Sequence, residues 1–212
     1  MADESRTQLP AKDRVRRSQA ERTAETRGKI MRAVVESITE VGFQKTTASE
    51  IARRAGLTWG AVQHHFGGKD GILAAVLEDS FERFAERLTS FPGEESPLEK
   101  RVAFFIDRSW EHFRSPHYRS TFEILLNYSD EERDADAPWK GQMLRAWNRI
   151  WSEIFSDSHL SRRRTVTLQH YTISALSGLA SMKMLEGPTA RIREAELTLL
   201  KETLVRELTR TD

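Results

Sequence analysis

The amino-acid sequence predicts an all-α fold, with a small N-terminal helical domain and a larger helical domain behind it. Apolar residues recur at spacings of three and four along most of the 212 residues, and no segment alternates with period two for long. A pair of short helices that meet at a glycine can be read between Thr46 and Lys69. Prolines separate the later apolar segments, where a missing backbone amide costs least: Pro92, Pro97, Pro116, Pro138 and Pro188.

Length and composition narrow the class of protein. A chain of 212 residues is long enough to bury a substantial core. It has no cysteine, which excludes disulfides and thiolate chemistry and makes a reducing cytoplasm the simplest compartment. The first twenty or so residues lack the apolar segment of a signal peptide, and no apolar run reaches the length of a membrane span. We therefore expect a cytoplasmic protein with no membrane partner.

The net charge of +1 conceals an uneven distribution along the chain. Residues 1–69 hold 13 Lys and Arg against 8 Asp and Glu, whereas residues 70–212 hold 20 against 24. The N-terminal part of the chain is therefore basic and the C-terminal part is acidic. This arrangement favours a protein whose N-terminal part faces the phosphates of nucleic acid.

Residues 1–22 are expected to form a disordered basic arm, because they are mostly charged or polar and have almost nothing to bury. Two interpretations of this arm stay open, namely a solvated tail and an arm that reaches the minor groove or the backbone of DNA. A first helix is predicted over about 24–41, where Ile30, Val34, Ile38 and Val41 lie on one stripe.

The stretch from Thr46 to Lys69 predicts a helix-turn-helix. Thr47 and Glu50 have the spacing of a capping box for the first short helix, and Gly56 can end it in the left-handed conformation. Thr58 can cap a second helix that ends near Phe66. This second helix is expected to turn small and hydrogen-bonding residues outward, which suits insertion into a major groove: Trp59, Gly60, Ala61, Gln63 and His64. A plain helical corner is the alternative.

The segment GFQKTTASEIARRAGLTWGAVQHHFGGKDGILAAV, from Gly42 to Val76, resembles the TetR family of bacterial transcriptional regulators. The resemblance implies a three-helix DNA-binding domain over 23–68, and a helical ligand-binding and dimerisation domain over 69–212. The residues it implies for DNA binding are Thr47, Ala48, Thr58, Trp59, Gly60, Ala61, Gln63, His64, His65 and Lys69. The family usually has Tyr where this chain has Gln63, and glutamine can either donate to a phosphate or read adenine.

The larger domain is predicted to contain further helices over about 69–90, 98–114, 117–128, 139–156, 161–186 and 189–209. Its middle helices are rich in aromatic residues, with polar residues between them, which is typical of a small-molecule pocket. The residues proposed to bind the ligand are Trp110, Phe113, Phe122, Leu126, Asn127, Trp147, Trp151, His170, Tyr171 and Ser174. The alternative for each of these residues is an ordinary place in the core.

The last two helices are predicted to form a homodimer interface. Small side chains share one face of the first of them and allow close approach of another helix, and the family dimerises through a four-helix bundle of this kind. The residues proposed for the interface are Ser174, Ser177, Gly178, Ser181, Met182, Leu200 and Leu204.

We interpret the chain as a homodimeric transcriptional regulator, a repressor that a small apolar or aromatic effector releases from double-stranded operator DNA. No cofactor, metal site or catalytic residue is expected, because the sequence has no nucleophile elbow, no dinucleotide fingerprint and no metal-ligand spacing. Two alternatives stay open: a DNA-binding structural factor without an effector, and an all-helical enzyme that carries the same kind of N-terminal domain. Ligand-induced stabilisation would argue against the first, and turnover would identify the second.

Overall fold

The computed structural model describes residues 18–91, 93, 95–127, 138–187 and 193–210. Within these ranges the regular secondary structure is entirely helical, which confirms the predicted all-α fold. The elements are α1 Gln19–Val41, the 3₁₀ turn η1 Phe43–Lys45, α2 Ala48–Ala55, α3 Trp59–Phe66, α4 Lys69–Arg87, α5 Leu98–Phe113, α6 Pro116–Asn127, α7 Pro138–Ile154, α8 Arg162–Glu186 and α9 Glu194–Leu208. None of these helices is both long and apolar enough to cross a bilayer.

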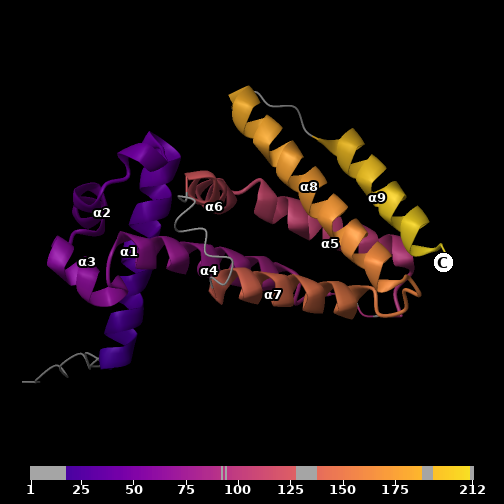
Figure 1. Ribbon diagram of the computed structural model, residues 1–212, viewed down its shortest axis with the longest axis horizontal. Coiled ribbons are helices and arrows are strands. Elements are labelled where there is room, and N and C mark those ends of the chain that lie inside the picture. Colours follow the sequence, from indigo (N-terminus) through magenta and orange to yellow (C-terminus); the bar gives the residue numbers. More distant parts are fainter. Residues whose placement is uncertain (1–17, 92, 94, 128–137, 188–192, 211–212) are drawn as a thin grey trace, which may run out of the picture.

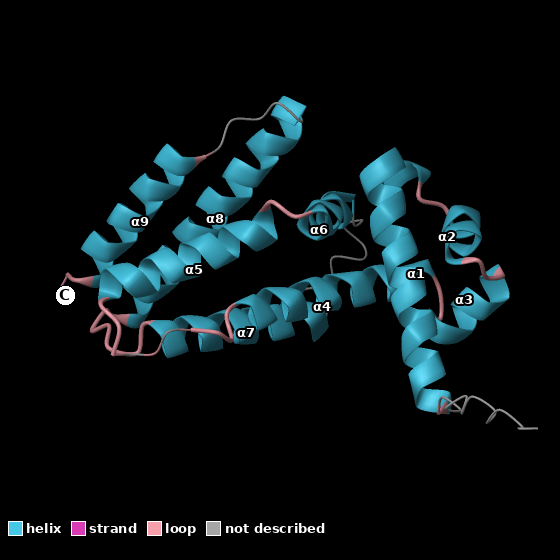
Figure 2. Cartoon of the chain, turned by 180° about the vertical axis from the view of Figure 1, so that it is seen from behind, coloured by secondary structure: helices cyan, strands magenta, loops and turns pink. Residues whose placement is uncertain are grey.

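The helices form two groups joined by α4 (Figure 1). At one end α1 packs on α2, α3 and α4, whereas at the other end α5 packs on α8 and α9. Helix α7 lies along α4 (Figure 2), and α6 contacts α1, η1, α4 and α5. Two helices, α4 and α6, therefore touch both groups.

Helix α1 begins earlier than the sequence analysis placed it. A capping box closes its start, in which Glu21 N donates to Ser18 Oγ at 3.2 Å and Ser18 N donates to Glu21 Oε2 at 2.7 Å. The arm predicted over 1–22 is therefore wrong for residues 19–22, which are helical because these bonds satisfy two free amides. Residues 1–17 of that arm lie outside the described residues.

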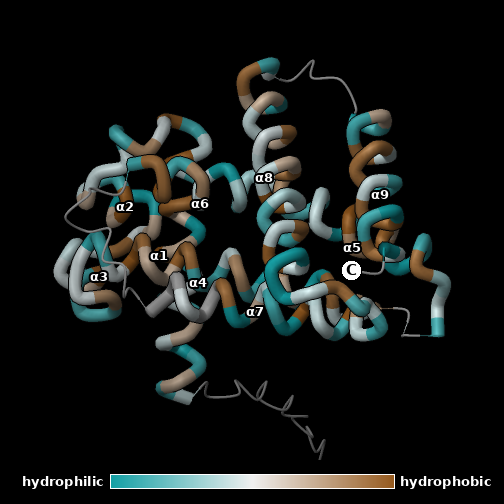
Figure 3. Tube along the Cα trace, turned by 45° about the vertical axis from the view of Figure 1, so that its right-hand side comes forward, coloured by the Kyte–Doolittle hydropathy of each residue, from teal (hydrophilic) through white to brown (hydrophobic). Residues whose placement is uncertain are grey.

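The N-terminal group has its own hydrophobic core. Its fully buried side chains come from α1, α2, α3, α4 and α6: Ile30, Val34, Ile38, Ile51, Val62, Ile72, Val76, Leu77 and Ile124. Figure 3 shows hydrophobic residues recurring among hydrophilic ones along these helices, as amphipathic helices around a core require.

A second core fills the larger group and is rich in aromatic rings. Phe84 of α4 stacks on Trp147 of α7 with ring centroids 5.3 Å apart, and Phe105 of α5 meets Trp151 edge to face at 5.7 Å. The buried guanidinium of Arg101 ties α5 to the end of α7, since it donates to Ile154 O at 2.8 Å and pairs with Asp157 at 2.5 Å. Offset and edge-to-face rings add specific geometry to this burial.

Gly71 in the first turn of α4 permits the close approach of α3 to α4. A Cβ at this position would lie 1.9 Å from the backbone carbonyl oxygen of Phe66, the last residue of α3. A backbone atom cannot swing aside as a flexible side chain can, so a larger residue must move one helix against the other. The angle between α3 and α4 therefore depends on this glycine.

We expect Gly71→Ala to lower the free energy of unfolding by about 2–3 kcal/mol, through overpacking against the Phe66 carbonyl. The matched control is Gly60→Ala in α3, where a Cβ would meet nothing within 4 Å. That variant should be unchanged or more stable by about 0.5–1 kcal/mol, because alanine favours helix. Urea unfolding followed by circular dichroism measures both, and equal effects would contradict the role of Gly71.

Candidate nucleic-acid interface and ligand pocket

The turn between α2 and α3 is set by Gly56, whose φ of 66° lies in the left-handed region that favours glycine. Thr58 then caps α3, because its Oγ1 accepts from the backbone N–H of Ala61 at 3.3 Å. The predicted glycine stop and the predicted Thr58 cap are both confirmed. Together they fix the direction in which α3 leaves α2.

Only half of the predicted capping box of α2 forms. Thr47 Oγ1 accepts from Glu50 N at 3.3 Å, but the Glu50 carboxylate bonds to the guanidinium groups of Arg53 and Arg54 at 2.5–2.9 Å. These hydrogen bonds, with that of Arg53 the strongest, lower the pKa of Glu50 to about 2. The second half of the prediction was wrong because charged partners are stronger hydrogen-bond donors than a backbone amide.

Helix α3 presents mainly small and hydrogen-bonding residues to solvent. The exposed residues predicted for DNA binding are Thr47, Thr58, Gly60, Gln63 and His64, and the half-buried ones are Ala48, Ala61, His65 and Lys69. Trp59 was predicted to face outward, and this was wrong. It is half-buried and packs against the N-terminal core, because burial of its large apolar ring is favourable. Helix α3 contains no acidic residue, so no carboxylate on it repels phosphates.

Two cationic side chains lie where α3 ends and α4 begins. Arg27 of α1 donates to His65 O at 2.5 Å, and its guanidinium lies 4.1 Å from the centroid of the Phe66 ring. Lys69 places its ammonium 4.9 Å from the centroid of the Phe43 ring. The first contact holds the end of α3 against α1, and the second holds the start of α4 against η1, so the middle residues of α3 stay free to face a groove.

The larger group contains a mainly apolar cavity of about 330 Å³ between α4, α5, α6, α7 and α8. This volume lies at the lower end of the range for small-molecule sites. The lining residues are Phe81, Phe84, His112, Phe113, Tyr118, Thr121, Phe122, Leu125, Leu126, Leu144, Ala146, Trp147, Ile173 and Ser177. Among these described residues there is no Lys, Arg, Asp or Glu, so the walls carry no formal charge except what His112 could gain.

The cavity gathers four of the ten residues predicted to bind a ligand: Phe113, Phe122, Leu126 and Trp147. Trp110 and Trp151 lie in or against the second core and do not line the cavity. The structure does not bring His170, Tyr171 and Ser174 to it either, because they lie on the exposed face of α8. Sequence analysis missed Phe81 and Phe84, whose helical spacing along α4 gave no sign that they face a cavity.

Asn127 also lies away from the cavity, and it joins the two groups of helices. Its Oδ1 accepts from Gln44 Nε2 of η1 at 2.8 Å. Nearby, the Glu123 carboxylate accepts from Phe43 N at 3.0 Å, and Ser120 Oγ donates to Val35 O at 3.2 Å. One face of α6 is thus bonded to α1 and η1, while its other face lines the cavity.

The surface proposed as a dimer interface divides between exposed and buried residues. Ser174, Gly178 and Met182 lie on an exposed face of α8, and a Cβ on Gly178 would meet nothing within 4 Å. Leu200 and Leu204 are instead buried in the second core, where they are 3% and 0% exposed. These two leucines of α9 therefore pack inside the chain. Exposed apolar residues flank the α8 face: Val166, Tyr171, Leu185 and Leu199.

Two interface candidates on α8 make contacts within the chain. Ser177 accepts a hydrogen bond from Tyr118 Oη at 2.9 Å and lines the cavity. Ser181 donates from its hydroxyl to Ser177 O at 2.8 Å, one turn back along the helix. The small-residue face of α8 is therefore partly turned toward α6.

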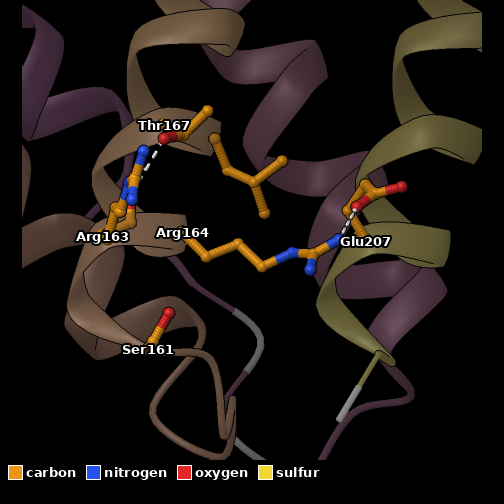
Figure 4. A pocket seen from close by; sticks show the side chains of 6 residues that line it. Ser161, Arg163, Arg164, Thr167 and Glu207 are labelled. Carbon is orange, nitrogen blue, oxygen red and sulfur yellow. Dashed lines mark hydrogen bonds and ion pairs between the residues drawn. The ribbon is translucent and has the colours of Figure 1, made fainter. Parts of the chain in front are cut away.

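A larger hollow of about 530 Å³ lies between the start of α8 and the end of α9, lined by Ser161, Arg163, Arg164, Thr167, Leu168 and Glu207 (Figure 4). Arg164 pairs with Glu207 at 2.5 Å across it, and Thr167 Oγ1 donates to Arg163 O at 2.9 Å. These groups already have partners, and an acidic and a basic residue face each other across the hollow. The apolar cavity is therefore the better candidate for a ligand site. In the described part of the chain, no three His, Asp or Glu residues gather as metal ligands.

Comparisons with known proteins agree with this geometry. The family model described as bacterial regulatory proteins, tetR family, matches residues 30–76. The HTH-type transcriptional regulator BetI of Burkholderia cenocepacia (strain HI2424) is 29% identical over 170 residues, which cover 80% of this chain and 73% of the relative. CymR of Pseudomonas putida, also an HTH-type transcriptional regulator, is 23% identical over 197 residues, covering 88% and 95%.

The fold is also similar to that of solved structures. The transcriptional regulator FadR from Bacillus subtilis, in complex with stearoyl-CoA, matches with a TM-score of 0.66 at 18% identity, and the match covers 85% of this chain and 96% of that one. At this level of identity the similarity shows the fold alone.

His112 makes the stability of the protein depend on pH. Burial, with the positive charges of Arg87 and His117, lowers the pKa of His112 to about 3, whereas an unfolded histidine titrates near 6.5. Between these values the unfolded chain binds a proton that the folded chain does not. The contribution of His112 to the free energy of unfolding is therefore fully present above about pH 6.5. It is lost as the pH falls, by at most about 1.4 kcal/mol per pH unit.

We expect His112→Phe to remove this dependence while keeping an aromatic ring in the wall. From pH 6.5 to 5.0 the wild type should lose up to about 2 kcal/mol more than the variant. Urea unfolding at a series of pH values measures the difference. His170→Gln on the exposed face of α8 is the control and should follow the wild type. Parallel curves for the wild type and His112→Phe would contradict the prediction.

Proposed function

The chain belongs to the TetR family of transcriptional regulators, and we propose that it acts as a homodimeric repressor that a small apolar effector releases from operator DNA. The observation that carries this proposal is the double attachment of α6. One face of this helix lines the cavity, and the other is hydrogen-bonded to the helices that hold the DNA-binding hairpin. A ligand that moved α6 would therefore act on α1 and η1 directly.

The DNA-binding role is assigned to the α2–α3 hairpin. Exposed Gln63 and His64 lie on the outward face of α3, and small Gly60 allows the helix to approach the floor of a major groove. Lys69 and Lys45 provide positive charge at the edge of this surface for phosphates. Phosphate contacts would position the hairpin, and contacts to base edges would give it sequence preference.

Dimerisation would place two such hairpins in successive major grooves, one helical turn apart. The exposed face of α8 supports this part of the proposal. Tyr171, Ser174, Gly178 and Leu199 border a shallow hollow of about 320 Å³ between α8 and α9, which a second copy could fill. An isologous packing of α8 and α9 from both copies would bury these apolar side chains.

Effector release would work by population shift. A ligand that fits the cavity better when α6 is displaced stabilises a dimer whose recognition helices have the wrong spacing. The relatives BetI and CymR are transcriptional regulators, and the FadR structure holds stearoyl-CoA, so small-molecule binding occurs on this fold. If the cavity stayed empty under all conditions, a DNA-binding structural factor would be the better assignment.

We expect Gln63→Ala to relax sequence preference at one position in each half-site, with a cost of roughly 1–3 kcal/mol on the preferred sequence. Lys69→Met is the contrasting variant, which keeps the aliphatic stem and removes only the charge. It should weaken binding equally on specific and random DNA and lower the salt slope by about one. Selection from random DNA, followed by salt titrations, measures both effects. An unchanged selected motif for Gln63→Ala would make Gln63 a backbone contact.

The dimer proposal predicts that Gly178→Leu weakens self-association by roughly 5- to 150-fold without unfolding the chain. Within one copy a Cβ at Gly178 meets nothing within 4 Å, so the substitution should leave the helical content and the monomer fold intact. Against a second copy the added bulk would force the helices apart, at roughly 1–3 kcal/mol. Gly178→Ala is the matched control. Sedimentation at low concentration measures association, and a fully dimeric Gly178→Leu chain would move the interface elsewhere.

A further inference from the structure

A groove of about 260 Å³ lies where the end of α1, the turn between α5 and α6, and the last turns of α8 meet. Phe113 lines both this groove and the apolar cavity, so the two hollows are neighbours. Three residues of the groove are basic, namely Arg114, Arg119 and Lys183, and none of its described lining residues is acidic. A hollow lined by one sign of charge attracts counter-ions, so the groove favours an anion.

Two of these three cations are available to a ligand. No ion pair or side-chain hydrogen bond joins Arg114 or Lys183 to another described residue, and Arg114 is exposed whereas Lys183 is half-buried. Arg119 differs, because its Nε donates to Glu123 Oε1 at 3.2 Å, and Glu123 does not line the groove. Three cations and this one paired carboxylate leave a net charge of +2, which a dianion would balance.

A simpler explanation covers two of these positions when each is taken alone. Arg114 is the C-cap of α5 and Lys183 lies in the last turn of α8, and a cation is favourable at the C-terminal end of a helix. This explanation does not account for both side chains lining the same groove as Arg119, with no carboxylate among the described lining residues. The convergence of the three cations is what points to a ligand.

The other lining residues suit a phosphate that carries a small apolar group. Ser115 Oγ accepts from Tyr118 N at 3.1 Å, which leaves its O–H as a donor to an anion. Guanidinium and ammonium groups form strong charge-assisted hydrogen bonds with phosphate oxygens. Phe113, Pro116 and Met184 supply apolar surface in the same groove. The groove thus combines charged donors with an apolar wall.

We propose that this groove is a second ligand site, which binds a phosphate monoester with a small apolar body. Arg114 and Lys183 hold the phosphate, whose charge is about −1.5 to −2 at neutral pH, and Phe113 contacts the body. Thr39 of α1 and Lys183 of α8 both line the groove, so the ligand contacts both groups of helices. This site goes beyond the effector role of the apolar cavity and does not depend on it.

Three probes separate the phosphate from the apolar body: phenyl phosphate, inorganic phosphate and phenol. Ligand-observed NMR of the full chain, with proton or phosphorus detection, gives their relative affinities. Phenyl phosphate should bind roughly tenfold more tightly than inorganic phosphate, because burial of the ring adds to the phosphate contacts. It should also bind more tightly than phenol. Added salt should weaken the binding of phenyl phosphate and leave the binding of phenol unchanged.

Arg114→Gln and Lys183→Met each remove one unpaired cation and keep an unbranched side chain. Each should weaken the binding of phenyl phosphate roughly 2- to 5-fold, as expected for an exposed ion pair, and the double variant should weaken it roughly 4- to 25-fold. Arg162→Gln is the matched control, because it removes the same charge from an exposed arginine at the other end of α8. It should bind phenyl phosphate as the wild type does.

Four other outcomes would each overturn the proposal. Phenyl phosphate that does not bind, or that binds the double variant as tightly as the wild type, would exclude the groove as its site. Phenol that binds as tightly as phenyl phosphate would place the ring in the apolar cavity. Inorganic phosphate that binds as tightly would make this a site for free phosphate. A lower salt slope for DNA binding by the double variant would assign the two cations to the DNA backbone.

Discussion

The structure depends on α4 being shared by two hydrophobic cores. Its first turns place Ile72, Leu73, Val76 and Leu77 in the N-terminal core, and its later turns place Phe84 in the second core. A helix of 19 residues is about 28 Å long and nearly rigid, so the two cores cannot move independently of it. At its start, the close contact between Gly71 and the Phe66 carbonyl fixes α3 against this rod. The position of the recognition helix is thus tied to the packing of the larger domain.

Helix α6 gives the two groups of helices a second connection. Helix α4 joins them by apolar packing, whereas α6 adds hydrogen bonds at Ser120, Glu123 and Asn127 to the packing of Ile124 in the N-terminal core. Apolar packing tolerates small rotations, but a hydrogen bond weakens steeply once its angle and length change. A displacement of α6 therefore affects α1 and η1 through these hydrogen bonds as well as through the N-terminal core.

Much of this fold could be predicted from the sequence, because the helices follow local rules. The apolar spacing, Gly56 and the Thr58 cap placed α2 and α3 correctly, and Pro97 and Pro116 marked helix starts that the structure confirms. The errors arose where the outcome depends on distant residues. Asn127 looked like a pocket residue until Gln44, 83 positions away, proved to be its partner. Tyr171 and Ser174 share α8 with Ile173 and Ser177, and only the packing of α8 against distant helices, chiefly α5 and α9, decides which pair faces the cavity.

The strength of the α6 connection matches what the proposed release by an effector would require. The bonds from Ser120 to Val35, from Phe43 to Glu123 and from Gln44 to Asn127 each contribute about 0.5–1.5 kcal/mol net. Losing two of them on ligand binding would change the balance between two conformations by about 1–3 kcal/mol. Coupling energies between sites typically lie in this range, which corresponds to a 5- to 150-fold change in affinity. A stronger connection would resist a small ligand, and a weaker one would leave the DNA-binding hairpin insensitive to the cavity.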